Sequence, residues 1–451
     1  MPASVPRLLI LSTLAIGLAA CNEKAKTPVA EGYGPNPTLP EPVTSWIPTV
    51  KVANAVGWKG DARPTAAPGM QVTAFATGLD HPRRVYALPN GDVLAVETAE
   101  PEKEVKPSGP KAWFQSFFMN KAGAKVPSAN RIVLLRDADG DGKAEFRSTL
   151  LAGLNSPFGV VLSNGTLYVA NADGVVSAPY RDGDTEIREA PQKVADLPGG
   201  PRNHHWTKDL TASKDGTKLY ATVGSNSNVA ENGMEEEKDR AAIIEIDVAS
   251  KRTRLFASGL RNPNGPAWNP ATGELWVVVN ERDEIGSDLV PDYMTSVKDG
   301  GFYGWPYSYY GKHVDNRVKP PRPDLVEKAI VPDYALGAHT ASLGLIFNEG
   351  GLFGEKYAGG AFVGQHGSWN RNPPSGYKVV FVPFRDGKPN GAPEDVLTGF
   401  LNKDGEAQGR PVGVAIDKAG ALLVADDVGN AVWRVTPAQA AAQAGEVKPQ
   451  G

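Results

Sequence analysis

One pattern of polar and apolar positions recurs along the chain: a short polar turn leads into a strand-like run in which apolar residues predominate. The turns hold Asn-Gly, Asp-Gly or a related pair, and such pairs between apolar runs are strong signals of β-hairpins. Sustained helical periodicity is almost absent, except in the alanine-rich tail 437–444, where we expect a short helix. The six copies of the unit, of which the fifth is the weakest, lie at residues 89–97, 163–171, 214–221, 271–278, 357–364 and 418–426.

Six such hairpins at irregular spacing predict an all-β fold, a six-bladed β-propeller with insertions. The alternative is a series of β-sandwiches, but the units are equal and no break in composition divides them. The chain has 451 residues, of which 41% are hydrophobic and 22% charged, so it can bury a large core. We therefore expect residues 69–451 to form one closed propeller domain.

The start of the chain reads as an export signal. Arg7 is followed by an apolar run, 8–18, and then by Leu-Ala-Ala-Cys, which resembles a bacterial lipobox. This predicts a signal peptide over residues 1–20, a lipidated Cys21 and a protein held at a membrane in the bacterial periplasm by its lipid anchor alone. The alternative is an ordinary signal peptide with an incidental cysteine. Residues 21–68 are then a proline-rich tether or N-terminal extension.

Composition and absent motifs exclude several functions. A formal net charge of −4 without a basic stripe argues against nucleic acid as a partner. No Gly-x-Gly-x-x-Gly follows a strand, and P-loop, Gly-x-Ser-x-Gly and His-Glu-x-x-His motifs are missing from the sequence. Cys21 is the only cysteine, so the mature domain has no disulfide within the chain. Any redox reaction would therefore need a cofactor other than a nicotinamide.

Polar clusters stand just ahead of two of the repeated units. His205 lies ahead of the strand-like run 218–224, and Arg261 and Asn262 lie ahead of the unit at 271–278. In a propeller, the loops that lead into the inner strands gather at one face, so we expect these residues to converge on one funnel. A histidine that takes a proton and an Arg-Asn pair that holds an oxyanion are the minimum parts for oxidising an alcohol. The alternative for His205 is a loop cap or a polar core position.

Four further stretches carry candidate binding residues. The acidic stretch 280–292 brings Glu281, Asp283 and Asp288 close together, which suits Ca²⁺ or a plain solvated loop. The stretch 300–307, with Trp305, combines aromatic rings and glycines that fit either a stacked planar ligand or packing between blades. Arg371 and Arg410 stand beside glycine-rich backbone, and arginines that face one funnel indicate an anionic ligand.

The stretch 137–142, Asp-Ala-Asp-Gly-Asp-Gly, places carboxylates at alternate positions around a turn glycine. It resembles the first half of an EF-hand loop but has Ser148 where the closing Glu would stand. Asp137, Asp139 and Asp141 form either a structural Ca²⁺ loop or an Asx turn.

Together these stretches resemble the glucose/sorbosone dehydrogenase family, six-bladed propellers that use pyrroloquinoline quinone (PQQ), and especially its sorbosone and pyranose dehydrogenase branch. The resemblance covers nearly the whole chain from about residue 69 to about residue 435. It is carried by DADGDG at 137–142, RNPNG at 261–265, ERD at 281–283, FYGWP at 302–306, HGSWNR at 366–371 and GRPVG at 409–413.

The resemblance implies a role for each matching residue. His205, five residues before Leu210, would be the general base, and Arg261, followed by Asn262, would contact the reacting quinone oxygen. Arg410, and less directly Arg371, would hold PQQ carboxylates. The family's Ca²⁺ would fall at Arg282 and Asp283, partly through backbone carbonyls, with Glu281 and Asp288 alongside.

Two departures from the glucose enzymes change the expectation locally. The Asp that accompanies their base is His204 here, so another group must orient His205, and Glu281-Arg282-Asp283 replaces their Gln-Gly-Pro. The implied function is PQQ-dependent oxidation of a sugar, or of a related polyol or aldehyde, with electrons passed to a periplasmic acceptor. A Ca²⁺-dependent propeller lactonase and a non-catalytic sugar- or protein-binding propeller are the alternatives. The sugar and the role of His339 are left open.

Overall fold

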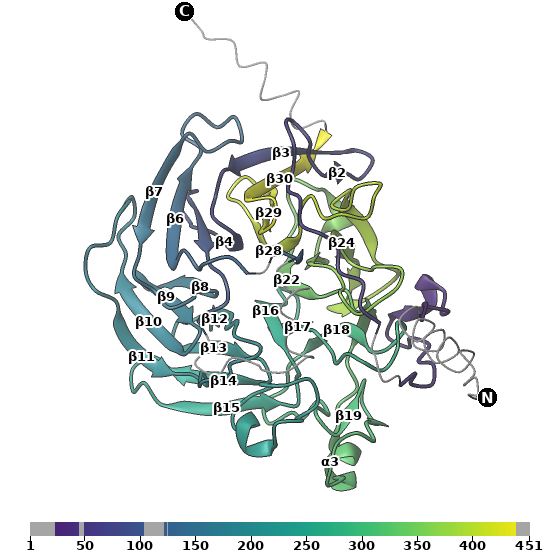
Figure 1. The fold of residues 1–451 in the computed structure, drawn as a ribbon. Coiled ribbons are helices and arrows are strands. Elements are labelled where there is room, and N and C mark those ends of the chain that lie inside the picture. The colour runs from purple at the N-terminus through teal and green to yellow at the C-terminus, as the bar shows by residue number, and fades with distance from the viewer. Residues whose placement is uncertain (1–22, 45–48, 103–120, 124, 439–451) are drawn as a thin grey trace, which may run out of the picture.

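A computed structural model describes residues 23–44, 49–102, 121–123 and 125–438. Six sheets stand side by side in a ring around a central axis (Figure 1). The predicted six-bladed β-propeller is confirmed. Cys21, the signal peptide and nearly all of the predicted C-terminal helix lie outside the described residues. Within them, no helix has the length and apolar character needed to span a membrane.

Each blade is an antiparallel meander whose first strand is innermost, and contacts between the first strands of successive blades close the ring. The first three blades are β4 (Pro82–Ala87), β5 (Val93–Glu97), β6 (Arg131–Arg136) and β7 (Phe146–Leu151); β8 (Val160–Ser163), β9 (Thr166–Asn171), β10 (Gly174–Pro179) and β11 (Gln192–Asp196); and β12 (Leu210–Ala212), β13 (Lys218–Val223), β14 (Ala242–Asp247) and β15 (Thr253–Ser258).

The last blade takes its outer strand from the other end of the chain, because β3 pairs antiparallel with β30. This pairing fastens the two ends of the domain together. The last three blades are β16 (Pro263–Trp268), β17 (Leu275–Val279), β18 (Pro291–Ser296) and β21 (Tyr334–Ala338); β22 (Ser342–Phe347), β23 (Ala361–Gln365), β24 (Lys378–Val382) and β27 (Glu394–Thr398); and β28 (Pro411–Ile416), β29 (Leu422–Asp426), β30 (Ala431–Pro437) and β3 (Met70–Thr77).

The N-terminal extension differs from the expected free tether, because its described parts pack on the propeller. Strand β1 (Tyr33–Gly34) extends one blade by pairing with β21, and β2 (Thr65–Ala66) extends the next by pairing with β27. The purple N-terminal segment accordingly lies beside β18 at the rim of the ring (Figure 1). The remaining short elements are η1 (Val29–Gly32), η2 (Met234–Glu237), η3 (Glu355–Tyr357), α3 (Pro323–Lys328) and the hairpins β19 (Ser308–Tyr309)–β20 (His313–Val314) and β25 (Phe384–Arg385)–β26 (Lys388–Pro389).

Each of the six predicted units contains the turn between the first and second strands of a blade, followed by the second strand itself. Those second strands are almost wholly buried, while outer strands such as β15 are half exposed, so the core lies between neighbouring sheets. One small cluster joins residues of four blades and therefore lies at the axis. We call it the central plug: Phe158, Ala172, Trp206, Leu343 and Val412.

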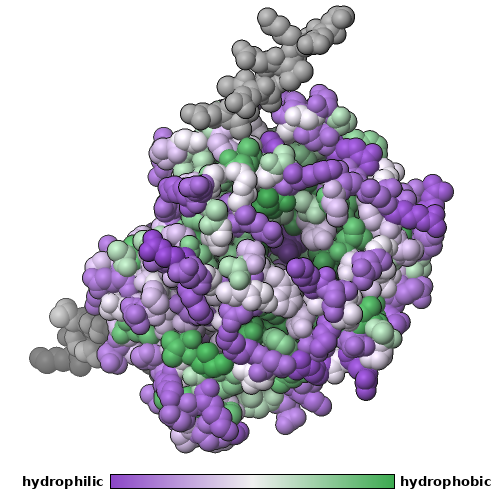
Figure 2. Space-filling view, turned by 180° about the vertical axis from the view of Figure 1, so that it is seen from behind, coloured by the Kyte–Doolittle hydropathy of each residue, from purple (hydrophilic) through white to green (hydrophobic). Residues whose placement is uncertain are grey.

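The meander fixes which loops share a face. Because neighbouring strands are antiparallel, the loop ahead of each first strand lies at the same end as the loop after each second strand. We call this end the long-loop face, and the opposite end, with the tight turns, the turn face. Seen from behind, the molecule is hollowed near the middle of the ring, with hydrophilic residues in the hollow (Figure 2). Residues far apart in sequence thus meet around the axis.

Candidate active site

His205 lies on the long-loop face, in the loop that leads into β12, and is half-buried. Its ring Nδ1 is 2.9 Å from the carbonyl oxygen of Ser225 and 3.0 Å from Oγ of the same residue. A carbonyl oxygen only accepts, and the Ser225 hydroxyl donates to the Ser227 carbonyl at 2.7 Å. Nδ1 therefore carries the hydrogen, and Nε2 keeps its lone pair for a proton from a substrate.

The surroundings of His205 favour the neutral ring. Burial lowers its pKa well below the ordinary value of 6.5, and the nearby Arg261 and His204 lower it further. The two imidazoles stand edge to face, with 4.6 Å between ring centroids. Within the described chain, the group that orients the ring of His205 is Ser225. The base is thus ready to accept a proton near neutral pH.

Arg261 reaches the same place from the loop ahead of β16. Its guanidinium donates to Asn228 Oδ1 at 2.9 Å and to the Glu281 carbonyl at 2.6 Å, and pairs with Asp283 at 3.2 Å. The backbone N–H of Ser225 donates to the Arg261 carbonyl at 2.7 Å. Ser225 therefore contacts both His205 and Arg261, which fixes the candidate base beside the candidate oxyanion holder.

Gly224 explains how Asn262 comes so close to His205. A Cβ at position 224 would collide with Asn262 Oδ1 and with the Cβ of His205, so only glycine fits. Asn262 Oδ1 is itself buried and has no hydrogen-bond partner among the described residues. A buried, unpaired acceptor beside a base indicates a ligand contact. Trp305, expected to contact the cofactor, is also buried, and its Nε1 already donates to the Asn228 carbonyl at 3.0 Å.

A second cluster on the long-loop face gathers around Asp427. Its Oδ2 lies 3.1 Å from Arg83 Nη1 and 2.9 Å from His366 Nε2, while His81 is 3.6 Å away. Burial alone would raise the pKa of Asp427, but the hydrogen bond from His366 and the charge of Arg83 hold it well below its usual range. Burial lowers the pKa of His366 to about 4 and also lowers that of His81. With both histidines neutral, one carboxylate faces Arg83 and the neighbouring Arg410, so the cluster carries an excess positive charge.

Arg83 and Arg410 both have donors to spare. Neither Nε atom has a hydrogen-bond partner among the described residues. Arg410 stacks on the Tyr377 ring at 4.9 Å, and the Arg83 guanidinium lies 5.8 Å from the Trp206 ring of the central plug. Since Trp206 adjoins His205 in the chain, both clusters border the plug. The arrangement fits a flat anion with carboxylates at one end and reactive oxygens at the other.

Glycine again shapes the loop that carries Arg410. The backbone N–H of Arg410 donates to Asp426 Oδ1 at 2.7 Å, and a Cβ at Gly409 would collide with that carboxylate. Asp426 also accepts from the indole nitrogens of Trp58 and Trp433 at 2.7 and 2.9 Å. The glycine in GRPVG is therefore required by the carboxylate that anchors Arg410.

Arg371 lies apart from these clusters. Its nearest carboxylate is Asp288, at 3.8 Å, and both residues line a cavity of about 240 Å³ beneath the N-terminal segment. Asp288 Oδ2 accepts the backbone N–H groups of Lys26 and Thr27 at 2.6 and 3.0 Å. The structure thus places this pair against the extension, and no contact joins Arg371 to Arg410 among the described residues.

The side chains of the four residues expected to surround the cofactor's Ca²⁺ take part in separate ion pairs. Arg282 is fully buried and pairs with Glu281 at 3.0 Å and Asp315 at 3.1 Å. The Glu281 carbonyl accepts from Arg261, and the Asp283 carbonyl accepts from Asn228 and Arg317. The Asp283 carbonyl thus has two donors and the Glu281 carbonyl has one, while Glu281 Oε1 is buried without a hydrogen-bond partner among the described residues. The Ca²⁺ that the resemblance implies at this loop stays a prediction.

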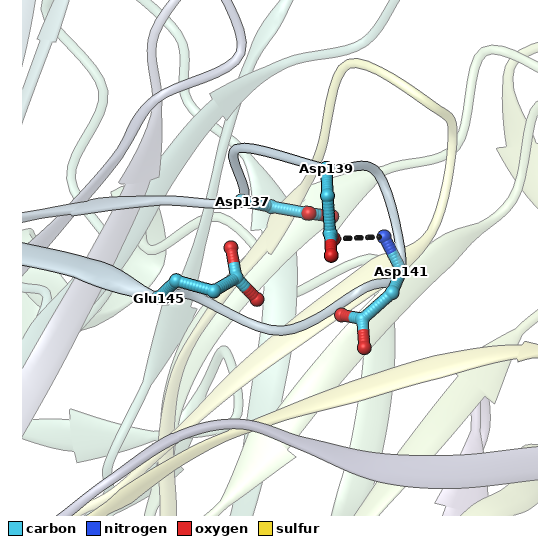
Figure 3. Close-up of side chains that lie close together, drawn as sticks. All are labelled: Asp137, Asp139, Asp141 and Glu145. Atoms are coloured by element: carbon cyan, nitrogen blue, oxygen red, sulfur yellow. Dashed lines mark hydrogen bonds between the residues drawn. The ribbon is translucent and has the colours of Figure 1, made fainter.

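The acidic turn between β6 and β7 does gather its carboxylates, but on the turn face. Asp137, Asp139, Asp141 and Glu145 place one oxygen each within 4.8 Å of one another (Figure 3). Glu145, nine positions into the loop counting from Asp137, was absent from the predicted set. Among the described residues, this is the one cluster of three or more acidic side chains close enough together to hold a metal ion, and carboxylate oxygens suit Ca²⁺.

Sequence reasoning missed Arg83, His366, Asp427 and Ser225. Arg83 could have been found from its position, because it stands at the beginning of the inner strand β4, much as Arg410 stands just ahead of the inner strand β28. His366 is part of the stretch HGSWNR that carries the resemblance, but its partner Asp427 is sixty-one residues further along. Such pairings follow only from closure of the ring.

Comparison with known proteins agrees with this geometry. The family model described as a domain of unknown function (DUF7133) matches residues 90–368, more than half of the chain, and a TrAA12-like model matches residues 326–438. A protein of Borreliella burgdorferi described as uncharacterized is 29% identical over 300 residues, which are 64% of this chain and 77% of that protein. A PQQ-dependent pyranose dehydrogenase of Coprinopsis cinerea is 26% identical over 223 residues, 40% of this chain and 30% of the fungal protein.

Solved structures share the propeller. The PQQ domain of the Coprinopsis cinerea pyranose dehydrogenase, in its holo form, superposes with a TM-score of 0.67 at 21% identity, covering 86% of this chain and 100% of that one. A Trichoderma reesei protein of carbohydrate-active enzyme family AA12 gives 0.67 at 20% identity, with the same coverage. The expected likeness to PQQ-dependent sugar dehydrogenases is confirmed, and the chain belongs to the family of the domain of unknown function DUF7133.

Proposed function

We propose that the protein is a PQQ-dependent dehydrogenase that oxidises a sugar, or a related polyol or aldehyde. The observation that carries the proposal is the shared contact of His205 and Arg261 with Ser225, beside the central plug that also borders Arg83 and Arg410. Bound PQQ would supply a quinone that accepts hydride from the substrate carbon. The names of the relatives support the cofactor and the substrate class.

His205 would act as general base. Its unprotonated Nε2 would take the hydroxyl proton of the substrate while hydride leaves the same carbon, so that the alcohol becomes a carbonyl. Ser225 would hold the ring in the tautomer that this step needs. The low pKa keeps the base neutral before each turnover.

Arg261 and Asn262 would hold the oxygen on which negative charge grows. A guanidinium fixed in advance by Asn228 and Asp283 needs no rearrangement as the charge develops. Removing one preorganised donor of this kind commonly raises the barrier by about 3–4 kcal/mol. Arg83 and Arg410 would bind the carboxylates with their free Nε–H groups.

Of the two Ca²⁺ sites expected from the sequence, the one in the acidic turn has its carboxylates gathered. We propose Ca²⁺ at Asp137, Asp139, Asp141 and Glu145, as a structural ion of the turn face. In the loop 281–288 the Glu281 and Asp283 carbonyls already accept from Arg261, Asn228 and Arg317, and we assign no catalytic step to a metal there.

Export and anchoring form a separate part of the proposal. Cys21 would carry a lipid that holds the protein at a membrane of the bacterial periplasm, and electrons would leave to a periplasmic acceptor. Intact-mass analysis of protein from a producing bacterium tests this: the account expects a lipidated Cys21 as the first residue. An unmodified thiol would contradict it.

The enzymatic proposal is tested by titrating the protein with PQQ and then measuring dye reduction with a panel of aldoses. We expect turnover only with PQQ, and we expect His205→Ala to keep PQQ while losing turnover. Lactone hydrolysis without PQQ would favour a hydrolase, and sugar binding without oxidation would favour a binding propeller. Either result would overturn the proposal.

A further inference from the structure

One short loop contacts both candidate catalytic residues. It runs from Ser225 to Asn228, directly after β13 on the long-loop face. Its first residue orients the ring of His205, and its last residue binds Arg261 through both Oδ1 and the backbone carbonyl, at 2.9 and 3.2 Å. The geometry of the base and of the guanidinium therefore depends on how firmly this loop is held.

Glu237 holds the loop from behind. One carboxylate oxygen accepts the backbone N–H of Asn226 at 2.7 Å, and the other accepts the hydroxyl of Ser227. The Glu237 residue is only 5% exposed, and burial raises its pKa. A buried carboxylate is costly unless its hydrogen bonds are satisfied. Here the protein turns both oxygens toward the middle of the loop.

The same chain segment also holds the loop that carries His205. Arg240, three residues after Glu237, donates to the Gly224 carbonyl at 3.2 Å and to Asn203 Oδ1 at 3.1 Å. Asn226 Oδ1 accepts the backbone N–H of His204 at 3.0 Å. The segment 237–240 thus contacts the chain on both sides of His205, at Asn203 and at residues 224–227, without an observed contact to the His205 ring.

We propose that Glu237 is a positioning residue that fixes His205 and Arg261 as one rigid unit through the loop 225–228. The inference deepens the proposed function and rests on it for the catalytic part. Without the carboxylate, two donors of the loop lose their acceptors and the loop relaxes. His205 then loses its fixed tautomer, and Arg261 loses its alignment by Asn228. Misplacement of about 1 Å can lower a rate by about a hundredfold.

The experiment compares three variants of the full-length protein. Glu237→Ala removes both acceptors, Glu237→Gln keeps one, and Glu235→Ala is the matched control, since Glu235 is exposed in the same turn, η2. The first readout is the ¹⁵N spectrum of histidine in the protein without cofactor; the chain has six histidines, so His205 can be assigned by substitution. The second is PQQ affinity by absorbance titration, and the third is kcat and KM for dye reduction.

In the control we expect the Nδ1–H signature of His205 and unchanged binding. In Glu237→Ala we expect a mixture of tautomers, PQQ affinity about tenfold weaker and kcat about a hundredfold lower, with KM changed much less. Glu237→Gln should recover part of each effect, and it carries the test if the alanine variant fails to fold. A His205 spectrum identical to that of the control in both Glu237 variants would overturn the inference. Failure of the intact protein to bind PQQ would instead overturn the proposed function, because the spectrum needs no cofactor.

Discussion

Arg261 forms an ion pair with Asp283, with 3.2 Å between Nη2 and Oδ2, and the other oxygen of Asp283 lies 3.2 Å from Nδ1 of His339. The second ring nitrogen of His339 is 2.9 Å from the Gly286 carbonyl. His339, whose role the sequence left open, thus supports the partner of Arg261 and does not reach His205. The carboxylate of Asp283 is therefore one of the groups that hold the guanidinium, together with Asn228 and the Glu281 carbonyl.

Asp283→Asn should therefore loosen Arg261 while leaving the fold intact. The Asp283 side chain is 16% exposed, so breaking the pair on one side should cost less than the about 3–5 kcal/mol that is typical of a fully buried pair. We expect a lower melting temperature in calorimetry and weaker PQQ binding in a titration. A variant with unchanged melting and binding would show that the pair is not what aligns Arg261.

The pH dependence of turnover reports on His205. Because its pKa lies well below 6.5, the unprotonated base persists to lower pH than an ordinary histidine, and activity is lost only as the pH falls through the lowered pKa. A profile of kcat/KM against pH for the PQQ-loaded protein should show its acid limb below pH 6.5. An acid limb above that value would contradict the buried, neutral base.

Substitution of Arg83 tests where the carboxylates of PQQ bind. The sequence did not single this residue out, and its proposed role comes from the structure alone. Arg83→Ala and Arg410→Ala should each weaken PQQ binding by about tenfold or more, because a charge-assisted hydrogen bond contributes about 1.5–3 kcal/mol. The matched control is Arg147→Ala, on the outer strand β7. If absorbance titration gave Arg83→Ala and the control the same affinity for PQQ, the carboxylates of PQQ would not bind at Arg83.

The acidic turn makes a prediction that is independent of the active site. Chelation should lower the melting temperature, and Ca²⁺ should restore it, while PQQ affinity stays the same because the turn lies on the opposite face. Asp139→Ala should abolish the Ca²⁺-dependent shift in a thermal scan. A shift that persists in this variant would assign the ion to another site.

The repeated turns predicted the blades because the conformation of a hairpin turn depends on a few adjacent residues. The same reasoning placed His205, Arg261 and Arg410 on one face, since each stands directly ahead of an inner strand. It paired Arg371 with the cofactor, whereas the structure pairs it with Asp288 beneath the N-terminal segment. That segment was taken for a tether, because two-residue edge strands leave no periodic signal.

The remaining site residues depend on contacts that no local pattern encodes. Arg83 and Asp427 are 344 positions apart and meet only because the last blade closes on the first. His205 is oriented by the backbone carbonyl of Ser225. Every residue has such a carbonyl, so the residue type at position 225 does not reveal this role. Composition and spacing therefore could not identify it.

The most direct test of the central claim is a single-turnover reaction under anaerobic conditions. The PQQ-loaded protein is mixed with an aldose that it oxidises, and the loss of quinone absorbance is followed in the intact protein and in His205→Ala. The account predicts rapid loss in the intact protein and loss slower by at least about a hundredfold in the variant, with equal PQQ bound at the start. Equal rates in the two proteins would contradict it.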